Sequence, residues 1–275
     1  MSAFCTRIAP TPSGFLHEGN GTSFALTQLL ANRHHGGILR LRIDDLDRGR
    51  FRPEYLADIF ETLAWMGIDQ FAGPQNAADF LNDHSQHHRL NRYSELLTQL
   101  VSTGRVYACD CSRRQVRERT GGGLLYDGFC RNRRLPLDQS NVNWRIHVPS
   151  DTTIRNFSLA ERTADFVVRK RDGLPAYQIG SVADDVDFGI TYVVRGADLL
   201  DSTLAQLYLA QLLQLTAFEQ ITFFHHPLLT DTGNEKLSKS AGATALRTWR
   251  AAGRPPTGLY DRARRWLAGE DNIVL

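Results

Sequence analysis

The chain has 275 residues, a length that suits one large α/β domain with an insertion or two small domains. With 32 basic and 30 acidic residues its net charge is +2, and this near balance argues against a general polyanion-binding protein. No apolar run approaches the roughly 20 residues of a membrane-spanning helix, and the amino-terminal residues lack the pattern of a secretory signal. We expect a cytoplasmic protein with no membrane partner, and a monomer.

The first third of the chain alternates predicted strands and helices. The helix expected at 19–35 has an apolar face that includes Phe24 and Leu30, and Gly36 and Gly37 end it. Strand–helix–strand order is typical of a βαβ unit in a parallel sheet. The expected elements in this part are strands at 4–9 and 38–43 and helices at 19–35, 54–66 and 84–103.

The middle of the chain has a different composition. Residues 107–143 are rich in Cys, Gly, Arg and Asp, and short antiparallel strands are expected at 144–148 and 165–169. After them the α/β pattern resumes. It predicts strands at 192–195 and 221–225, a helix at 202–215 and a basic helical tail at 244–267.

These patterns predict an α/β fold with a Rossmann-like parallel sheet, an inserted subdomain and a short carboxyl-terminal helical region. We expect the first half of the sheet domain at 1–104, the insertion at 105–180 and the second half at 181–230. The last part, 231–275, contains a lysine-bearing loop and the helical tail.

The loop from Pro10 to Asn20 leaves a predicted strand and opens a predicted helix. Glycines at 14 and 19 allow close approach of a ligand to the backbone, and the helix start offers N–H groups and a positive dipole end to phosphate. His17 can donate hydrogen bonds to phosphate oxygens. Alone, such a segment is more often an ordinary loop than a nucleotide site.

A second segment, Lys236-Leu237-Ser238-Lys239-Ser240, places two cations close together near Gly233 and Gly242. Such cations can stabilise the negative charge that develops on departing pyrophosphate. Alone, a short lysine-containing run is more often a solvated loop.

Together, these two segments resemble the paired motifs of class I aminoacyl-tRNA synthetases. His17-Glu18-Gly19-Asn20 corresponds to the first motif, and the segment from Lys236 to Ser240 corresponds to the second. The resemblance implies an ATP site with Mg²⁺. It implies ATP binding by His17, Gly19, Asn20, Lys236 and Lys239, with catalytic roles for His17, Lys236 and Lys239.

Four further segments are similar to glutamyl-tRNA synthetases, and they extend the resemblance over nearly the whole chain. They are residues 7–14, 41–47, 172–178 and 193–198. Arginine binds a carboxylate through two parallel hydrogen bonds, which suits a glutamate side chain. The resemblance implies glutamate binding by Arg7, Ala9, Thr11, Asp44, Tyr177 and Arg195.

For this predicted pocket an alternative stays open. Arg7 and Arg195 could instead form ion pairs inside the fold with Asp45 or Asp198. If the pocket binds glutamate, Asp44 takes the substrate ammonium and Tyr177 closes the site.

The chain ends at Leu275, about 35 residues after Ser240, whereas glutamyl-tRNA synthetases continue into an anticodon-binding region. The shorter form resembles glutamyl-queuosine tRNA(Asp) synthetases. That resemblance implies tRNA-independent activation of L-glutamate, followed by its transfer to the queuosine base at the wobble position of tRNA(Asp). The implied partners are therefore ATP, L-glutamate and tRNA(Asp) carrying queuosine.

The cysteines agree with this narrower family, whose inserted zinc site has a Cys-x-Cys pair followed by Tyr and Cys. The resemblance implies one structural Zn²⁺ held by Cys109, Cys111, Tyr126 and Cys130. Zinc favours four ligands, and three thiols alone are one short. Asp110 or a water in place of Tyr126, or three metal-free thiols, are the alternatives.

Two residues depart from the family pattern. Glu18 replaces an apolar residue, and its carboxylate would repel phosphate unless it points away from it. Asp44 is one methylene shorter than the usual Glu, and a water can bridge the gap to the substrate ammonium.

Two hypotheses compete with this function: a truncated glutamyl-tRNA synthetase that charges a tRNA 3′ end, and a non-catalytic RNA-binding paralogue. A further open point is the basic tail, which either contacts tRNA phosphates or is a solvated helix. Its arginines are Arg247, Arg250, Arg254, Arg262, Arg264 and Arg265.

Overall fold

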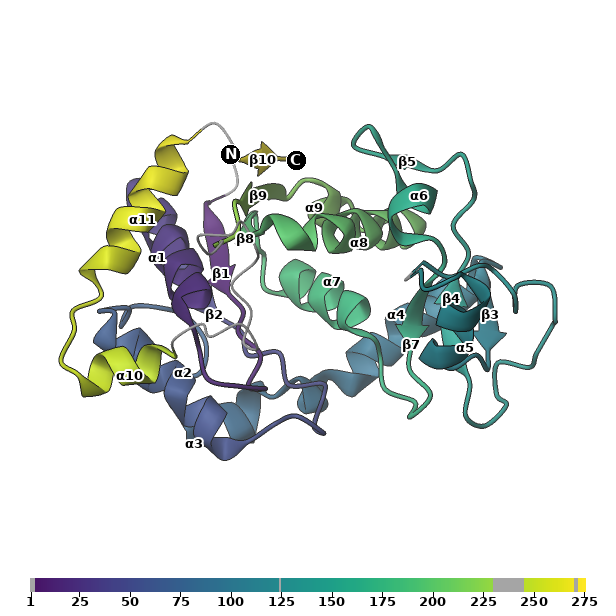
Figure 1. Ribbon diagram of the computed structural model, residues 1–275, viewed down its shortest axis with the longest axis horizontal. Helices are drawn as coiled ribbons and strands as arrows, with labels where there is room; N and C mark the ends of the chain where they lie inside the picture. Colours follow the sequence, from purple (N-terminus) through teal and green to yellow (C-terminus); the bar gives the residue numbers. More distant parts are fainter. Residues whose placement is uncertain (1–2, 124, 230–244, 270–271) are drawn as a thin grey trace. The chain divides into compact units, whose positions relative to one another are not determined.

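A computed structural model describes residues 3–123, 125–229, 245–269 and 272–275, and these divide into two compact units (Figure 1). The first unit consists of Met1–His88, Gly189–Leu199 and Ile221–Leu275, and the second consists of Arg89–Phe188 and Leu200–Gln220. Within these described ranges, no helix is both long enough and apolar enough to cross a membrane.

The first unit is built on a five-stranded mixed sheet in the order β10-β9-β8-β1-β2. Strand β1 pairs in parallel with β2 and β8, and β8 pairs in parallel with β9, so the expected parallel sheet is confirmed. Among the described strands of this sheet, only β10, at one edge, is antiparallel to its neighbour. The strands are β1 (Cys5–Ile8), β2 (Ile38–Leu41), β8 (Tyr192–Gly196), β9 (Thr222–His226) and β10 (Ile273–Val274).

Strand β1 lies between two neighbours, and all four of its residues are buried. Burial on both faces is typical of a strand inside a parallel sheet that helices cover. Cys5 lies opposite Ile38, and Ile8 lies opposite Leu41, while Thr6 lies opposite Tyr192 on the other side. Arg7 is therefore held inside the sheet, one residue before the carboxyl end of the strand.

Helix α1 (Glu18–Arg33) packs beside helix α11 (Thr257–Ala268), although the two are far apart in the sequence (Figure 1). Gly21 allows this close packing. A Cβ atom at Gly21 would lie 2.7 Å from Cδ1 of Leu259 and 2.8 Å from Cδ1 of Leu246. Both leucines are fully buried, so the amino end of α1 is fixed against the carboxyl-terminal helices.

The predicted helical tail is two helices, α10 (Leu246–Ala251) and α11. Pro255 and Pro256 separate them, because proline has no N–H to continue a helix and fits best at a helix start.

The first unit further contains α2 (Pro53–Trp65), α3 (Ala77–Asp79), a π-helical turn (Phe80–His84) and 3₁₀ turns at Gln86–Arg89 and Ala197–Leu199.

The second unit contains a three-stranded antiparallel sheet in the order β3-β4-β7, a two-stranded hairpin of β5 and β6, and several helices. The two strands that the sequence predicts here are confirmed as β4 and β7. The elements are β3 (Val106–Cys109), β4 (Asn143–Ile146), β5 (Thr153–Ile154), β6 (Phe157–Ser158), β7 (Phe166–Arg169), α4 (Leu90–Ser102), α5 (Arg113–Arg119), α6 (Leu159–Thr163), α7 (Tyr177–Asp187), α8 (Leu200–Leu212) and α9 (Thr216–Glu219).

A buried polar contact joins α4 to α7 in this second unit. The hydroxyl of Tyr93 donates to Asp184 at 2.8 Å, and Nε of Arg89 donates to the same carboxylate at 2.7 Å. Tyr93 and Asp184 are both fully buried. A buried carboxylate needs such partners, because an unpaired charge in the interior is strongly unfavourable.

Candidate functional site

The four parallel strands of the first unit have their carboxyl ends at one edge of the sheet. In open parallel sheets, ligands bind beyond this edge, in the segments that follow the strands. Here the following segments carry His17 after β1, Asp44 after β2 and His226 at the end of β9. The geometry of these segments therefore decides which ligand the site can take.

His17 caps the amino end of α1 with both its side chain and its backbone. Its Nδ1 accepts a hydrogen bond from the N–H of Gly19 at 3.1 Å, and its own N–H donates to Oδ1 of Asn20 at 3.1 Å. Because Nδ1 is an acceptor, the neutral imidazole carries its proton on Nε2. The three motif residues thus form one reciprocal capping arrangement with a defined histidine tautomer.

Gly19 has a steric reason to be glycine at this cap. A Cβ atom there would lie 3.0 Å from Cε1 of His17, closer than side-chain carbons normally approach. Glu18, the residue between them, turns away from the cap, and its Oε2 accepts from Nη1 of Arg262 at 3.1 Å. The structure therefore directs the out-of-pattern carboxylate toward α11.

Lys236 and Lys239 lie in 230–244, outside the residues that the structure describes. The described residues on both sides of that segment lie close to the start of α1. Leu229 comes within 4.0 Å of the position of a Cβ atom on Gly19. On the other side, the N–H of Leu246 donates to the carbonyl of Leu16 at 2.8 Å.

Arg7 and Arg195 lie on the neighbouring strands β1 and β8, and both side chains are buried, with 5% and 4% of their surface exposed. The guanidinium of Arg195 lies 5.3 Å from the ring centroid of Phe223. Asp45, one of the alternative partners for these arginines, binds Ser85 Oγ at 2.6 Å and the N–H of Gln86 at 2.8 Å. Its third contact is Nη2 of Arg48 at 3.1 Å, so Asp45 anchors the 85–86 segment.

Asp44 has a partner that the sequence did not indicate. Its carboxylate accepts from Nε of Arg42 at 2.7 Å and from Nη2 of Arg42 at 3.2 Å. Its N–H donates to the carbonyl of Pro10 at 2.9 Å, which joins the segments after β1 and β2. Asp44 and Arg42 are buried together, and the i, i+2 spacing was the only sequence signal for the pair.

The other predicted glutamate-binding residues occupy less enclosed positions. Ala9 is half-buried, and Thr11 is exposed, with its carbonyl accepting from the N–H of Ser13 at 2.8 Å. Tyr177 belongs to the second unit, where it is the first residue of α7 and is 40% exposed.

Two histidines at the end of β9 were not identified from the sequence. His225 is fully buried, and burial together with the positive charge of Arg195 lowers the pKa of its imidazole to about 4. The ring of His226 stacks on that of Trp266, with centroids 4.3 Å apart, and its Nδ1 lies 2.8 Å from the carbonyl of Pro227. Burial lowers the pKa of His226 as well, so both rings are neutral at pH 7.

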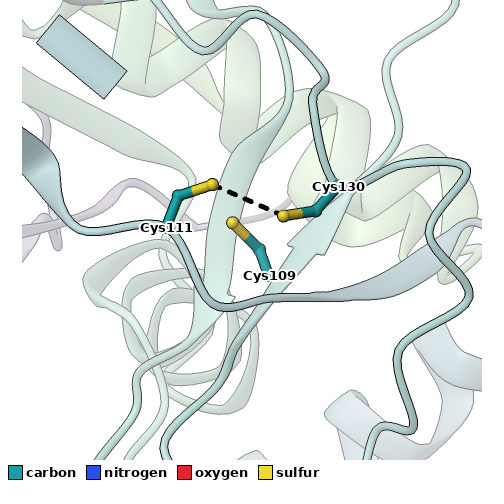
Figure 2. Close-up of side chains that lie close together, drawn as sticks. All are labelled: Cys109, Cys111 and Cys130. Carbon is teal, nitrogen blue, oxygen red and sulfur yellow. Dashed lines mark hydrogen bonds between the residues drawn. The ribbon is translucent and has the colours of Figure 1, made fainter. Parts of the chain in front are cut away.

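The second unit brings the three clustered cysteines together around Tyr126. The thiol groups of Cys109, Cys111 and Cys130 converge from β3, from the residues just after it and from the loop that follows α5, and Figure 2 shows the contact between Cys111 and Cys130. All three sulfur atoms lie within 4.8 Å of one another, and those of Cys111 and Cys130 are 3.4 Å apart. The phenol oxygen of Tyr126 lies 3.3 Å from Sγ of Cys109 and 3.8 Å from Sγ of Cys111.

These distances fit a four-coordinate metal site. A tetrahedral zinc with bonds of about 2.3 Å to sulfur places its sulfur ligands about 3.8 Å apart. Burial raises the pKa of the Cys111 thiol to about 11. At Cys109 burial opposes ionisation, but the hydrogen bonds with Tyr126 and Arg145 prevail and lower the pKa. The cluster therefore offers the donor set of a zinc site, and ionisation is easier at Cys109 than at Cys111.

Two arginines contact this cluster from outside. Nη2 of Arg119 donates to Sγ of Cys111, and Nη1 of Arg133 donates to Sγ of Cys130, both at 3.4 Å. Asp110, the alternative fourth ligand, accepts from Nη1 of Arg133 at 2.7 Å and lies 3.4 Å from Sγ of Cys130. Such partners favour thiolates and orient the ligands of a metal site.

The arginines of the basic tail take part in several contacts within the first unit. Arg250 pairs with Asp58 at 2.9 Å and with Glu61 at 2.6 Å. Arg262 pairs with Glu18 at the start of α1. The remaining contacts are Arg247 over Phe15, Arg254 over Trp249 and the exposed pair of Arg264 with Asp261.

Known proteins are similar in sequence to this chain over most of its length. Residues 3–123 and 138–270 match the family model described as tRNA synthetases class I (E and Q), catalytic domain. A glutamyl-Q tRNA(Asp) synthetase of Ectopseudomonas mendocina is 38% identical over 281 residues, which cover 95% of this chain and 90% of that protein. A glutamyl-Q tRNA(Asp) synthetase of Burkholderia cenocepacia is 38% identical and covers 87% of this chain and 81% of its own length.

Similar structures agree with the family model. A crystal structure of glutamate-tRNA synthetase from Elizabethkingia anophelis superposes with a TM-score of 0.73 at 26% identity, over 88% of this chain. The match covers 53% of that longer enzyme, about half its length. Since relatives with 38% identity are matched over up to 90% of their length, the chain belongs to the glutamyl-Q tRNA(Asp) synthetase family of class I tRNA synthetases, which are ligases.

Proposed function

We propose that this enzyme activates L-glutamate with ATP, without tRNA, and then transfers the glutamate to the queuosine base at the wobble position of tRNA(Asp). The observation that carries the proposal is the reciprocal cap of His17, Gly19 and Asn20 at the carboxyl edge of the parallel sheet. The names of the relatives, which share 38% of their residues with this chain, support the choice of glutamate and of tRNA(Asp).

In the first step, an oxygen of the glutamate α-carboxylate forms a bond to the α-phosphorus of ATP. The bond from that phosphorus to the bridging oxygen breaks, and pyrophosphate leaves. His17 donates from Nε2 to phosphate oxygens, because its Nδ1 is already occupied by the N–H of Gly19. The amino end of α1 adds its partial positive charge, and Asn20 keeps the cap in place.

Lys236 and Lys239 stabilise the leaving pyrophosphate, and ATP enters as its Mg²⁺ complex, which offsets part of the phosphate charge. Support comes from Leu229 and Leu246, which lie on either side of 230–244 and both approach the start of α1. The sequence has only three lysines, and two of them are these residues. A lysine is a compact charge on a flexible stem, which suits a moving phosphate group.

For the amino acid, we propose that Arg7 and Arg195 bind the glutamate side-chain carboxylate, since both guanidinium groups are buried on adjacent strands. Asp44 binds the ammonium group, and Arg42 holds the Asp44 carboxylate in one orientation. Ala9 and Thr11 line the pocket from the loop after β1. Tyr177, at the start of α7, contributes its hydroxyl.

In the second step, a hydroxyl of the queuosine cyclopentene ring attacks the carbonyl carbon of glutamyl-adenylate. The bond from that carbon to the phosphate oxygen breaks, an ester forms, AMP leaves with the electron pair of the broken bond, and the hydroxyl proton passes to solvent. No side chain becomes covalently attached. Orientation and charge stabilisation supply the acceleration.

We further propose one structural Zn²⁺, held by Cys109, Cys111, Cys130 and the phenol oxygen of Tyr126. When bound, the metal would join β3 to the loop after α5. Arg119 and Arg133 would favour the thiolate form of the two cysteines that they contact.

The experiment for the first step is glutamate-dependent exchange of labelled pyrophosphate into ATP in the absence of tRNA. Wild-type protein should support exchange, and Lys239→Ala should reduce it at least about a hundredfold, the scale of removing one transition-state charge interaction. Lys170→Ala is the matched control, because Lys170 pairs with Asp172 on the surface of the second unit. Absence of exchange in the wild type would overturn the enzymatic proposal.

The experiment for the second step compares transfer of labelled glutamate to tRNA(Asp) with and without queuosine. One observation favours a second candidate function, charging of a tRNA 3′ end. The glutamate–tRNA ligase 1 of Acidithiobacillus ferrooxidans is 34% identical over 98% of this chain, although the match covers 58% of that ligase. Glutamate attached to tRNA that lacks queuosine would select this second function.

A further inference from the structure

Phe129 is an exposed aromatic residue beside the cysteine cluster, and two guanidinium groups lie near its ring. Its side chain is 52% exposed. The guanidinium of Arg119 lies 4.3 Å from its ring centroid, and that of Arg133 lies 5.4 Å from it. A phenylalanine this exposed contributes little to the core, and its ring is accessible to a partner.

The two guanidinium groups are held in fixed orientations. Arg119 donates from Nε and Nη2 to the carboxylate of Asp127 at 2.5 and 3.0 Å. Arg133 donates to Asp110 at 2.7 Å, and both arginines also donate to cysteine sulfur atoms. Groups that are ordered before binding lose less entropy when a ligand arrives.

The surroundings of Phe129 are strongly basic. Residues 109–134 contain seven arginines and three acidic residues, whereas the whole 275-residue chain has a net charge of +2. The charge is therefore local to this subdomain. Three of these seven arginines, Arg113, Arg114 and Arg117, are exposed on helix α5.

We infer that Phe129, Arg119 and Arg133 form a stacking platform for an unpaired base of RNA, with the arginines of α5 contacting neighbouring phosphates. An exposed ring among cations is the combination by which proteins bind single-stranded nucleic acid, because every base has a π-face and every nucleotide a negative charge. Aromatic residues and arginine also occur at protein interfaces, but seven arginines against three acidic residues in 109–134 favour a polyanionic partner. The inference rests on the proposed function, in which the acceptor base of tRNA(Asp) is an unpaired wobble base.

The test measures the dissociation constant for queuosine-containing tRNA(Asp) with Phe129→Ala, Phe129→Trp and wild type. Phe129→Ala should weaken binding at least about fivefold, the lower end for loss of one stacked base, and Phe129→Trp should preserve it. The matched control is Leu125→Ala, an apolar residue of the same loop that is 42% exposed. It should leave the dissociation constant unchanged.

The salt dependence of tRNA binding separates the contribution of stacking from that of charge. Phe129→Ala should lower the binding constant at every salt concentration. It should not change the slope of log binding constant against log salt concentration, because loss of a phenylalanine changes no counterion release. A variant lacking the arginines of α5, Arg113→Ala with Arg117→Ala, should reduce the slope by about 0.7 to 0.9 for each phosphate that is no longer neutralised. An RNA duplex without unpaired bases should bind wild type and Phe129→Ala equally.

Zinc content and pyrophosphate exchange show whether a failed test contradicts the stacking platform or the proposed function. Phe129→Ala should retain zinc content and tRNA-free pyrophosphate exchange, which shows that the fold and the first step are intact. If exchange is normal and tRNA binding by Phe129→Ala stays within twofold of wild type, the platform is wrong, even if the ring binds another protein. If exchange is absent in the wild type but Phe129→Ala still weakens RNA binding, the platform stands and the proposed function fails.

Discussion

Glu18 and Arg262 form an ion pair between the first residue of α1 and helix α11, with 3.1 Å between Oε2 and Nη1. About a quarter of each side chain is exposed, at 25% and 29%. The pair explains how an acidic residue fits beside His17. Its negative charge is favourable in the first turn of a helix, and the guanidinium offsets its repulsion of a bound phosphate.

Removal of this partner should weaken ATP binding. In Arg262→Ala the carboxylate of Glu18 loses this partner but stays in the first turn of α1, where the phosphate site is proposed. At an effective dielectric constant near 20 and a separation of roughly 10 Å, this repulsion is on the order of 1–2 kcal/mol, or about a tenfold higher KM for ATP. The measurement is pyrophosphate exchange at varied ATP.

Two variants serve as controls for this prediction. Glu18→Gln combined with Arg262→Ala removes both charges and should return the KM for ATP to near the wild-type value. Arg264→Ala changes an exposed arginine of the same helix, paired only with Asp261 in the described structure, and should have no effect. An unchanged KM in Arg262→Ala would show that Glu18 lies too far from the phosphates to matter.

The cysteine cluster makes a prediction about metal content. Purified protein should contain one zinc per chain, and Cys109→Ser should lose it and melt at a lower temperature, because metal binding is coupled to folding of the site. Cys5→Ala is the control, since Cys5 is a buried cysteine of β1 in the other unit. Wild-type protein without zinc, measured by mass spectrometry, would contradict the proposed site.

The variant Tyr126→Phe tests whether the phenol oxygen is a zinc ligand, because it leaves the three thiols in place. The phenol oxygen accepts from the N–H of Cys130 at 2.8 Å and contacts Cys109 and Cys111. If it is the fourth ligand, this variant should bind zinc at least about tenfold more weakly while keeping the three thiols. Unchanged zinc affinity would assign the fourth position to Asp110 or water.

The sequence predicts the elements of the first unit well, because their signals are local. The helix expected at 19–35 is observed as Glu18–Arg33, and the strand expected at 38–43 is observed as Ile38–Leu41. Glycines, caps and apolar periodicity lie inside each element and need no knowledge of distant residues. The break at Pro255 and Pro256 is equally local, and the predicted helical tail is observed as two helices, Leu246–Ala251 and Thr257–Ala268.

The partners of the charged residues could not be predicted from the sequence. Glu18 and Arg262 are 244 positions apart, and nothing in either segment indicates the other. The same holds for Arg250 of the basic tail, which pairs with Asp58. Ion pairs depend on how helices pack, and any of the 32 basic residues could have met any of the 30 acidic ones.

The buried pair of Arg42 and Asp44 predicts a combined effect on substrate and stability. Asp44→Asn should raise the KM for glutamate at least about tenfold, because a charged hydrogen bond to the ammonium contributes roughly 1.5–3 kcal/mol. It should also lower the melting temperature, since the buried guanidinium of Arg42 loses one charged partner. Asp45→Asn is the control: it disturbs the contacts with Ser85 and Gln86, so it should lower stability with little change in KM.

His225 predicts how the first unit responds to acid. Burial and the charge of Arg195 lower the pKa of its imidazole to about 4, below the 6.5 of an exposed histidine. The unfolded chain therefore binds a proton at His225 more tightly than the folded chain does. The contribution of neutral His225 to the free energy of unfolding is complete above pH 6.5 and is lost as the pH falls toward 4. Between pH 7 and pH 4.5 the loss is about 2–3 kcal/mol.

Comparison of variants isolates this contribution from the acid sensitivity of the carboxylates. His225→Asn cannot take up the proton, so its free energy of unfolding in urea should fall less than that of the wild type between pH 7 and pH 4.5. His35→Asn alters an exposed histidine and should show the wild-type loss. Equal losses in all three proteins would mean that His225 is solvated or paired when protonated. Stability of the folded protein would then not depend on a neutral imidazole at position 225 beside Arg195.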